Sequence, residues 1–214
     1  MSKIYLIRHG ETISNANATF QGQTNSPLSK LGRKQAQVLA HRLRKDQIKV
    51  DRLIASTLGR AIETAQYISE SIQCEIETDP ELQEINLGNW EGLSWNQISD
   101  KFPQYSDEYH EKWWQFKQHG GESWTEALER FYSAVLRLVN TSPSKNLMIV
   151  AHGGVIRVLI AKLLGSHSPK PPLEISNTGI TEIEILGDQM KFTRINDHNH
   201  LAYCLPNTSQ INES

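Results

Sequence analysis

Two short runs of apolar residues constrain the fold of this chain more than any other feature of its sequence. Residues 4–7 and residues 147–151 are entirely apolar. Runs of this length are typical of strands buried on both faces, and such strands occur mainly in parallel sheets that helices cover. The first run ends abruptly in Arg-His-Gly and the second in His-Gly-Gly. We therefore expect a buried sheet whose strands end in polar residues.

The segments around these runs alternate between strand and helix character. We expect further strands at residues 53–55, 74–77 (an edge strand), 180–186 and 191–195, and helices at residues 28–45, 56–71, 123–138 and 155–164. Ser29 can cap the first helix, and Ser123 with Glu126 forms a capping box for the third. In the first helix, Leu31 is expected on the apolar side. This alternation predicts an α/β fold of three layers, α/β/α, with a mainly parallel central sheet.

The chain shows no internal repeat and no linker, so a single domain over residues 1–214 is expected. One region departs from the regular alternation, because all five tryptophans fall within residues 90–124. Pro103 divides this region, which predicts two short helices rather than one. Its aromatic residues recur at helical spacing, which favours packing, although a helical insertion of this kind could also form a small lid. The last ten residues, 205–214, are expected to form a polar tail.

Composition excludes several classes of function. The formal net charge is −2, so no basic surface suggests nucleic acid as a partner. The apolar runs are too short to cross a bilayer, and the N-terminus lacks a secretory apolar region. The two cysteines, Cys74 and Cys204, form no disulfide framework or metal-binding pattern. We therefore expect a cytoplasmic protein that binds neither nucleic acid nor membranes.

Three of the expected strands end in a chemically similar way. Arg8 and His9 follow the first strand, His152 follows the apolar strand 147–151, and the strand 53–55 leads through a serine to Arg60. In an open parallel sheet, ligands bind beyond the carboxyl ends of the strands. A single histidine after a strand is more often a surface residue, but three such coincidences favour one shared site.

Two arginines and two histidines suit the transfer of a phosphoryl group. Guanidinium groups match the oxygens of a phosphate, and the helix start at Gly153 adds backbone N–H groups that attract anions. A histidine can attack phosphorus when its imidazole is neutral and an acceptor holds its other N–H. One histidine would act as the nucleophile and the other as an electrostatic partner. No metal or other cofactor is required, and the expected partner is a small phosphorylated metabolite.

The leaving oxygen of such a reaction needs an acid. The segment ELQEINLGNWEG offers three carboxylates, Glu81, Glu84 and Glu91. Glu84 precedes a glycine turn and the aromatic insertion, where partial desolvation and an arriving phosphate would favour its neutral form. These residues alone leave Glu84 equally interpretable as a solvated loop residue.

Four motifs together resemble the histidine phosphatase superfamily, also called the phosphoglycerate mutase-like family. They are LIRHGET, STLGRAIETA, EINLGNWEG and VAHGGVIR, which occur in the family's order and span nearly the whole chain. The resemblance implies the phosphoglycerate mutase-like α/β/α fold and a reaction without metal. Members of the family are often dimers, so a homodimer is the assembly to consider.

The resemblance also implies roles for individual residues. His9 corresponds to the residue phosphorylated during turnover, and Glu84 to the proton donor. The resemblance places His152 beside the nucleophile. It implies three phosphate ligands, Arg8, Asn15 and Arg60, and a substrate loop that contains Gln21 and Gly22.

Within this family the sequence favours a phosphatase. The stretch from residue 90 to 123 is compact, and the patterns GNWEG and GGES resemble the phosphatase branch. A 2,3-bisphosphoglycerate-dependent phosphoglycerate mutase is the alternative. A catalytically silent phosphate-binding module is disfavoured, because nucleophile, arginines, second histidine and acid are all present.

The sequence leaves the substrate open among phosphoserine, α-ribazole phosphate, sugar phosphates, phosphoglycerate and a broad range. Leu87 stands where related phosphoserine phosphatases tend to have a histidine, which argues against that substrate. His200 could reach a substrate carboxylate, although a surface position is expected. His198 and His200 lack a third ligand that would make them a metal site.

Overall fold

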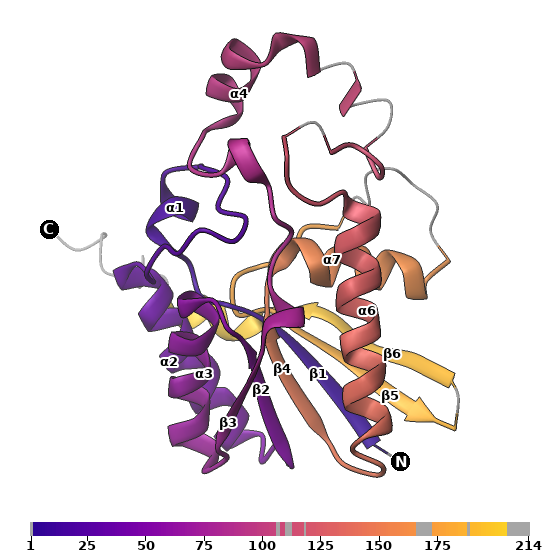
Figure 1. The fold of residues 1–214 in the computed structure, drawn as a ribbon. Coiled ribbons are helices and arrows are strands. Elements are labelled where there is room, and N and C mark those ends of the chain that lie inside the picture. Colours follow the sequence, from indigo (N-terminus) through magenta and orange to yellow (C-terminus); the bar gives the residue numbers. More distant parts are fainter. Residues whose placement is uncertain are drawn as a thin grey trace, which may run out of the picture.

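The computed structural model describes residues 2–105, 108–109, 113–117, 119–165, 173–187 and 189–204. In this part of the chain six strands form one sheet in the order β3-β2-β4-β1-β5-β6 (Figure 1). The strands are β1 (Ser2–Arg8), β2 (Arg52–Ser56), β3 (Ile76–Asp79), β4 (Leu147–Ala151), β5 (Ile180–Leu186) and β6 (Gln189–Asp197). All six lie where the sequence predicts strands, and β3 is the expected edge strand.

The sheet is mixed rather than uniformly parallel. The strands β1, β2, β3 and β4 run parallel, whereas β5 pairs antiparallel with β1 and β6 antiparallel with β5. Parallel neighbours need a long crossover connection, and only two residues separate β5 from β6. These last two strands therefore pair as antiparallel neighbours.

Helices cover both faces of the sheet. They are α1 (Ile13–Ala16), α2 (Lys30–Lys45), α3 (Gly59–Ile72), α4 (Trp95–Lys101), α6 (Trp124–Asn140) and α7 (Gly153–Leu163), with 3-10 turns η1 (Pro80–Leu82), η2 (Gly88–Trp90), η3 (Pro103–Tyr105) and η4 (Asn199–Cys204). Figure 1 shows α2 and α3 together on one side, and α6 and α7 on the other. Among the described helices, none is both long enough and apolar enough to cross a membrane.

The side chains of β4 show how the two covered faces form the core. Met148 and Val150 belong to the apolar cluster that includes α2 and α3. Leu147, Ile149 and Ala151 belong to the cluster that includes α6 and α7. Because successive residues of a strand point to opposite faces, an all-apolar strand buries both of its sides. The predicted three-layer arrangement is confirmed.

The predicted helix starts are also present. Ser29 Oγ accepts a hydrogen bond of 3.0 Å from the N–H of Gly32, and Ser123 forms a capping box with Glu126. The expectation for Leu31 was wrong, because this side chain is 42% exposed. Gly32, Gln35, Ala36, Leu39, Ala40 and Leu43 form the buried side of α2.

The aromatic insertion is packed, as its spacing suggests. Helix α4 ends before Pro103, and the second expected helix falls partly on residues outside the described part of the chain. Trp113 and Phe116 are buried, and the ring of Trp90 lies 5.1 Å from that of Phe116. Movement of this insertion as a lid stays a prediction. The expected polar tail also lies outside the described residues.

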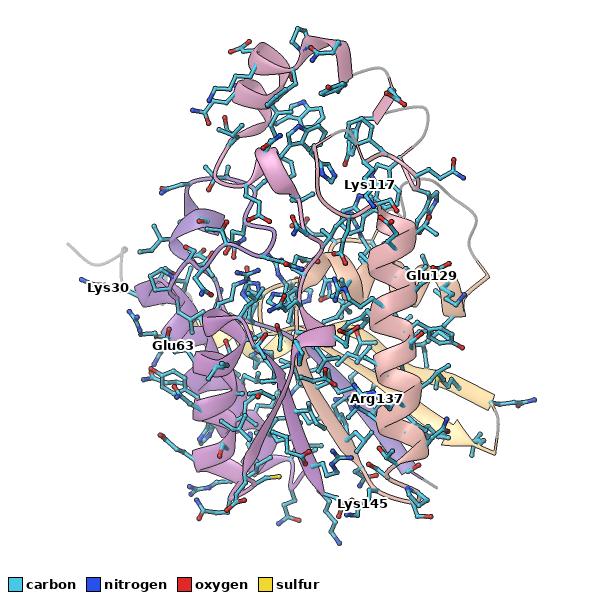
Figure 2. The ribbon with its side chains drawn as sticks, in the orientation of Figure 1. Lys30, Glu63, Lys117, Glu129, Arg137 and Lys145 are labelled. Carbon is cyan, nitrogen blue, oxygen red and sulfur yellow. The ribbon has the colours of Figure 1, made fainter. Side chains whose placement is uncertain are left out.

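The insertion lies over one end of the sheet. Figure 2 shows Lys117, in the insertion, and Lys145, just before β4, at opposite ends of α6. Figure 1 shows β1, β2 and β4 ending beneath the segment that carries α4. The insertion therefore lies at the carboxyl ends of these strands.

The loop after β1 packs closely on the first turn of α2. A Cβ atom at Gly10 would lie 2.6 Å from the carbonyl oxygen of Gly32. A Cβ atom at Gly32 would lie 1.9 Å from the carbonyl oxygen of Glu11. Both close approaches involve backbone atoms, which cannot rotate away. The two glycines therefore set how the segment following β1 lies on α2.

Replacing Gly32 with alanine is expected to destabilise the protein, although alanine is usually favoured over glycine inside a helix by about 1 kcal/mol. The added methyl group must displace the Glu11 backbone, so we expect the free energy of unfolding to fall by roughly 1–3 kcal/mol in chemical denaturation. Gly59→Ala is the matched control, because a Cβ there meets only Asn25 Oδ1 at 3.6 Å. Equal stability of the two variants would contradict the close packing.

Candidate active site

The strand register brings the predicted site residues to one edge of the sheet. Arg8 pairs with Ala151, the residue before His152, and Ala55 of β2 pairs with Val150. The N–H of His9 donates a hydrogen bond of 3.0 Å to the carbonyl oxygen of Ala151. The ends of β1, β2 and β4 therefore lie side by side, as the pattern of apolar runs predicts.

A cavity of about 650 Å³ opens at this edge. Eight of the nine site residues expected from the sequence line it: Arg8, His9, Asn15, Gln21, Gly22, Arg60, Glu84 and Gly153. The ninth, His152, is fully buried and is not part of the lining. Its ring centroid lies 5.1 Å from that of His9, so the two imidazoles are neighbours.

The proton on His9 is fixed by its neighbours. His9 Nδ1 lies 2.7 Å from the carbonyl oxygen of Gly10, which can only accept. Nδ1 therefore carries the proton and Nε2 keeps its lone pair. Burial, followed by the positive charges of Arg60 and Arg8, holds the pKa of His9 well below its usual value. The imidazole is thus neutral, and Nε2 is its unprotonated nitrogen.

One N–H group of Arg60 serves both histidines. Arg60 Nε lies 3.2 Å from Nε2 of His9 and 3.2 Å from Nδ1 of His152. Since the guanidinium only donates, both ring nitrogens must be unprotonated. His152 then carries its proton on Nε2, which donates to Ser56 Oγ at 2.8 Å. Burial lowers the pKa of Arg60 to about 10, so it stays charged at neutral pH.

The environment of His152 is similarly unfavourable to a second proton. The pKa of His152 lies well below its usual value, mainly because the ring is buried and also because the positive charge of Arg60 is close. Two neutral imidazoles and two charged guanidinium groups therefore occupy this edge. Such a set attracts an anion and offers it a nucleophile.

Arg8 lies across the start of α7. Its Nη1 donates to the carbonyl oxygen of Ile175 at 2.5 Å, whereas its buried Nε has no partner among the described residues. A Cβ atom at Gly153 would lie 3.0 Å from Arg8 Nε, so glycine there lets the guanidinium approach the helix. Gly153 itself is the first residue of α7, where backbone N–H groups lack partners within the helix.

Glu84 is held at the same helix start. Its Oε2 accepts from the N–H of Gly154 at 2.9 Å, and its Oε1 accepts from Val155 at 3.0 Å and Ile85 at 3.1 Å. A Cβ at Gly154 would lie 2.6 Å from Glu84 Oε1, so this position also needs glycine. The sequence predicts that phosphate binds at this helix start, but the N–H groups of Gly154 and Val155 donate to Glu84 instead. The N–H of Gly153 is therefore the remaining candidate for a phosphate contact.

Glu91 has a structural position instead. Its Oε1 accepts hydrogen bonds from the N–H groups of Gln23 at 2.8 Å and Leu87 at 3.1 Å. Gly22 has a φ of +52°, and a Cβ there would lie 2.1 Å from Glu91 Oε1. Glu91 therefore anchors the loop that contains Gly22. Of the three carboxylates considered, Glu84 is the one that lines the cavity.

The two amide residues of the site are linked through Thr12. Asn15 Oδ1 accepts from the N–H of Thr12 at 3.1 Å. The Thr12 hydroxyl also lies 2.8 Å from Gln21 Oε1. Thr12 thus holds both amide oxygens, and the amide nitrogens of Asn15 and Gln21 remain the groups that a ligand could contact.

Arg130 is a site residue that the sequence did not reveal. From α6 it donates to the carbonyl oxygens of Gln83 at 3.0 Å and Glu84 at 3.2 Å, and it forms an ion pair of 2.8 Å with Glu122. It therefore fixes the backbone from which Glu84 projects. No local pattern predicts this, because α6 is distant in sequence from the segment it holds.

His200 lies outside the cavity of His9. Its side chain is buried, with Nε2 lying 2.9 Å from Thr178 Oγ1 and Nδ1 lying 3.3 Å from Arg42 Nη1. The expected surface position was therefore wrong, and contact with a substrate carboxylate is not supported. Within the described residues, no three His, Cys, Asp or Glu side chains could share a metal ion.

Comparison with known proteins identifies the family of the chain. A sequence profile of the histidine phosphatase superfamily (branch 1) matches residues 4–198. The probable phosphoglycerate mutase GpmB of Yersinia pestis (strain Pestoides F) is 31% identical over 186 residues, which cover 86% of this chain and 85% of that protein.

Two solved structures are also similar to this chain. YhfR of Bacillus stearothermophilus is 30% identical, has a TM-score of 0.84, and covers 94% of this chain and 100% of its own. A mycobacterial glucosyl-3-phosphoglycerate phosphatase is 30% identical, with a TM-score of 0.78 and coverage of 92% and 99%. The match over residues 4–198 spans most of the sequence, and the chain belongs to the histidine phosphatase superfamily, branch 1.

Proposed function

We propose that this protein is a metal-independent phosphatase that hydrolyses a small phosphomonoester through a phosphohistidine intermediate on His9. The observation that carries the proposal is the proton arrangement of His9. Its Nδ1–H is held by Gly10, and its unprotonated Nε2 lies beside Arg60 in the cavity. This is the state that nucleophilic attack on phosphorus requires.

The first step forms one bond and breaks another. Arg8 and Arg60 bind the phosphate oxygens, while the N–H of Gly153 and the amide of Asn15 complete the phosphate contacts. The lone pair of His9 Nε2 attacks phosphorus, and the bond to the leaving oxygen breaks. The negative charge of the bound phosphate favours the neutral form of Glu84. Glu84 then gives its proton to the leaving oxygen, because an alkoxide leaves poorly at neutral pH. His152 stabilises the phosphorylated site through Arg60.

In the second step water replaces the alcohol. Glu84 is now a carboxylate and takes a proton from the water as its oxygen attacks phosphorus. The bond between phosphorus and His9 Nε2 breaks, which returns the lone pair to the imidazole and releases inorganic phosphate. Gln21 and Gly22 border the space where the alcohol and then the water enter. The cycle uses no metal or other cofactor.

A phosphoglycerate mutase is the second candidate, since one relative carries that name. A mutase must bind a substrate with two phosphorylated positions. In the described part of the cavity the cationic residues are Arg8, Arg60 and Arg157, and no lysine is present. This is little positive charge for two phosphates, which favours hydrolysis. A silent binding module remains disfavoured, because the candidate nucleophile, acid and arginines surround one cavity.

The proposal also covers the cellular compartment, the binding partner and the assembly of the enzyme. A small phosphorylated metabolite in the cytoplasm is the partner that agrees best with the low cysteine content and the charge of the chain. A homodimer is the proposed assembly on family resemblance alone.

We expect the wild-type protein to release inorganic phosphate from phosphomonoesters and to carry acid-labile phosphate after a rapid quench. One reaction with 3-phosphoglycerate, primed with 2,3-bisphosphoglycerate, should follow free phosphate and the two phosphoglycerate isomers together. Phosphate release should dominate, and isomer exchange much faster than release would make the protein a mutase. His9→Ala should lose both turnover and the trapped phosphate, so near wild-type turnover in this variant would exclude the mechanism.

Glu84→Gln tests the proton donor. The amide keeps the shape of the side chain but cannot protonate the leaving oxygen. Substrates with an alkoxide leaving group should lose roughly 10²–10⁴-fold in kcat. Hydrolysis of p-nitrophenyl phosphate should fall much less, because its phenolate leaves without a proton. Equal losses on both substrates would assign Glu84 a structural role only.

The protonation state of His9 can be measured directly. Histidine nitrogen NMR should show His9 as the neutral Nδ1–H form at pH values down to about 6, because its pKa lies well below the usual value near 6.5. The sign follows from burial and two arginines, which both oppose the imidazolium form. The spectrum of His9→Ala identifies the signals. A His9 ring that gains its proton near pH 6.5 would contradict the proposed environment.

A further inference from the structure

His200 is a buried ionisable side chain to which the proposed chemistry gives no role. It belongs to η4 and is 2% exposed. The cavity that it lines lies beside α2 and has a volume of about 690 Å³, whereas His9 lines the other cavity. A buried imidazole is costly unless its ring nitrogens are paired. The partners of His200 therefore indicate what this residue holds in place.

The proton of His200 is on Nε2. Arg42 Nη1 lies 3.3 Å from Nδ1, and a guanidinium can only donate, so Nδ1 is unprotonated. Nε2 then carries the proton and donates to Thr178 Oγ1 at 2.9 Å. Burial, followed by the charge of Arg42, lowers the pKa of His200 to about 4, although Asp197 acts in the opposite direction. The ring is therefore neutral at neutral pH, where this arrangement holds.

Arg42 is itself fixed by a carboxylate. Its Nη1 and Nη2 donate to the two oxygens of Asp197 at 3.0 and 2.5 Å. Such a two-bond pairing sets the plane of the guanidinium as well as its position. The donor that faces His200 is therefore fixed, and the imidazole is oriented at Nδ1 by Arg42 and at Nε2 by Thr178.

Thr178 has an unusual backbone conformation. Its φ is +58°, in the left-handed region that a β-branched residue rarely adopts. Such a conformation persists only where the surrounding contacts enforce it, and strained residues of this kind are concentrated at functional sites. Thr178 is fully buried, and the hydrogen bond from His200 is one of the contacts that hold it. We next consider what this residue holds in turn.

The segment before β5 holds the end of β1. The N–H of Thr178 donates to the carbonyl oxygen of Arg8 at 2.9 Å. The side-chain amide of Asn177 donates to the carbonyl oxygen of His9 at 3.0 Å. The Arg8 guanidinium donates to the carbonyl oxygen of Ile175 at 2.5 Å. This segment therefore binds the backbone and side chain of the candidate phosphate ligand and the backbone of the candidate nucleophile.

We propose that His200 is a positioning residue, which through its hydrogen bond to Thr178 fixes the end of β1 and so the position of the His9 imidazole. The inference rests on the proposed function, because the nucleophilic role of His9 belongs to that proposal. His200 lines a different cavity, so it acts through Thr178 and not on the substrate. Its effect on the reaction can still be large, since a displacement of about 1 Å at a reacting atom can cost about 10²-fold in rate.

His200→Leu removes both ring nitrogens and keeps an apolar side chain in the buried space. We expect kcat for p-nitrophenyl phosphate to fall by roughly 10–100-fold, because the nucleophile is misplaced. KM should change much less, since Arg8 and Arg60 remain to bind the phosphate. His200→Gln should restore most of kcat, because its amide offers a donor to Thr178 and an acceptor to Arg42.

His41→Leu is the matched control for the leucine variant. His41 is an exposed histidine on α2 that lines the same cavity as His200, so its replacement should leave kcat unchanged. A folded His200→Leu protein with the wild-type kcat would overturn the inference. So would a glutamine variant that is as impaired as the leucine variant, because the role would then not depend on the hydrogen bond.

A double-mutant cycle tests whether His200 acts through Thr178. Thr178→Val removes the hydroxyl acceptor but keeps the shape of the side chain, and it also serves if His200→Leu does not fold. Each variant breaks the same hydrogen bond, so combining them should lower kcat no further than the more impaired single variant. Losses that multiply in the double variant, or a folded Thr178→Val protein with the wild-type kcat, would overturn the inference.

A measurement without turnover separates this inference from the proposed function. Histidine nitrogen NMR should show His200 as the neutral Nε2–H form, and the His9 signals should shift in His200→Leu but not in His41→Leu. His9 signals that stay unchanged in His200→Leu would contradict the positioning role. If wild-type protein hydrolyses p-nitrophenyl phosphate and His200→Leu keeps its kcat, the inference fails and the phosphatase proposal stands. If no phosphomonoester is hydrolysed but the His9 signals depend on His200, the phosphatase proposal fails and the positioning role stands.

Discussion

The arrangement of the site depends on one buried N–H group. Arg60 Nε lies between Nε2 of His9 and Nδ1 of His152, so it sets the protonation of both rings at once. The other guanidinium nitrogens donate to the carbonyl oxygens of Thr24 at 2.9 Å and Gly22 at 2.7 Å. Burying a charge is costly unless its hydrogen-bonding groups are paired. The same guanidinium therefore fixes two imidazoles and the substrate loop, and its charge adds to the effect of burial, which is the main reason that both imidazoles are neutral.

The start of α7 joins the binding and acid parts of the site. Gly153 allows Arg8 to lie against the helix, and Gly154 leaves room for the carboxylate of Glu84. Any side chain at either position would meet one of these two groups. Phosphate ligand and candidate acid are thus held against the first turn of one helix, which sets their separation more rigidly than two independent loops could.

The cavity has two chemically different parts. Toward the sheet, Arg8 and Arg60 provide two positive charges next to His9. Toward the insertion, aromatic rings hold Arg157 and the N–H of Trp90. The insertion therefore does more than cover the strand ends, because the rings of Trp113 and Trp124 hold the guanidinium of Arg157 at the wall of the cavity.

The sequence by itself determined the layers of the fold and the meeting of Arg8, His9, Arg60 and His152. Apolar runs identify buried parallel strands, and the carboxyl ends of such strands share an edge, so local patterns were sufficient. Only the tertiary structure decided the antiparallel direction of β5, the buried position of His200 and the contacts that hold Glu84, a residue that the family motifs had already singled out. Each depends on contacts between distant segments, as when Glu84 accepts from the N–H of Gly154 at 2.9 Å. No periodicity or motif records such a contact, because it forms only when the helices have packed on the sheet.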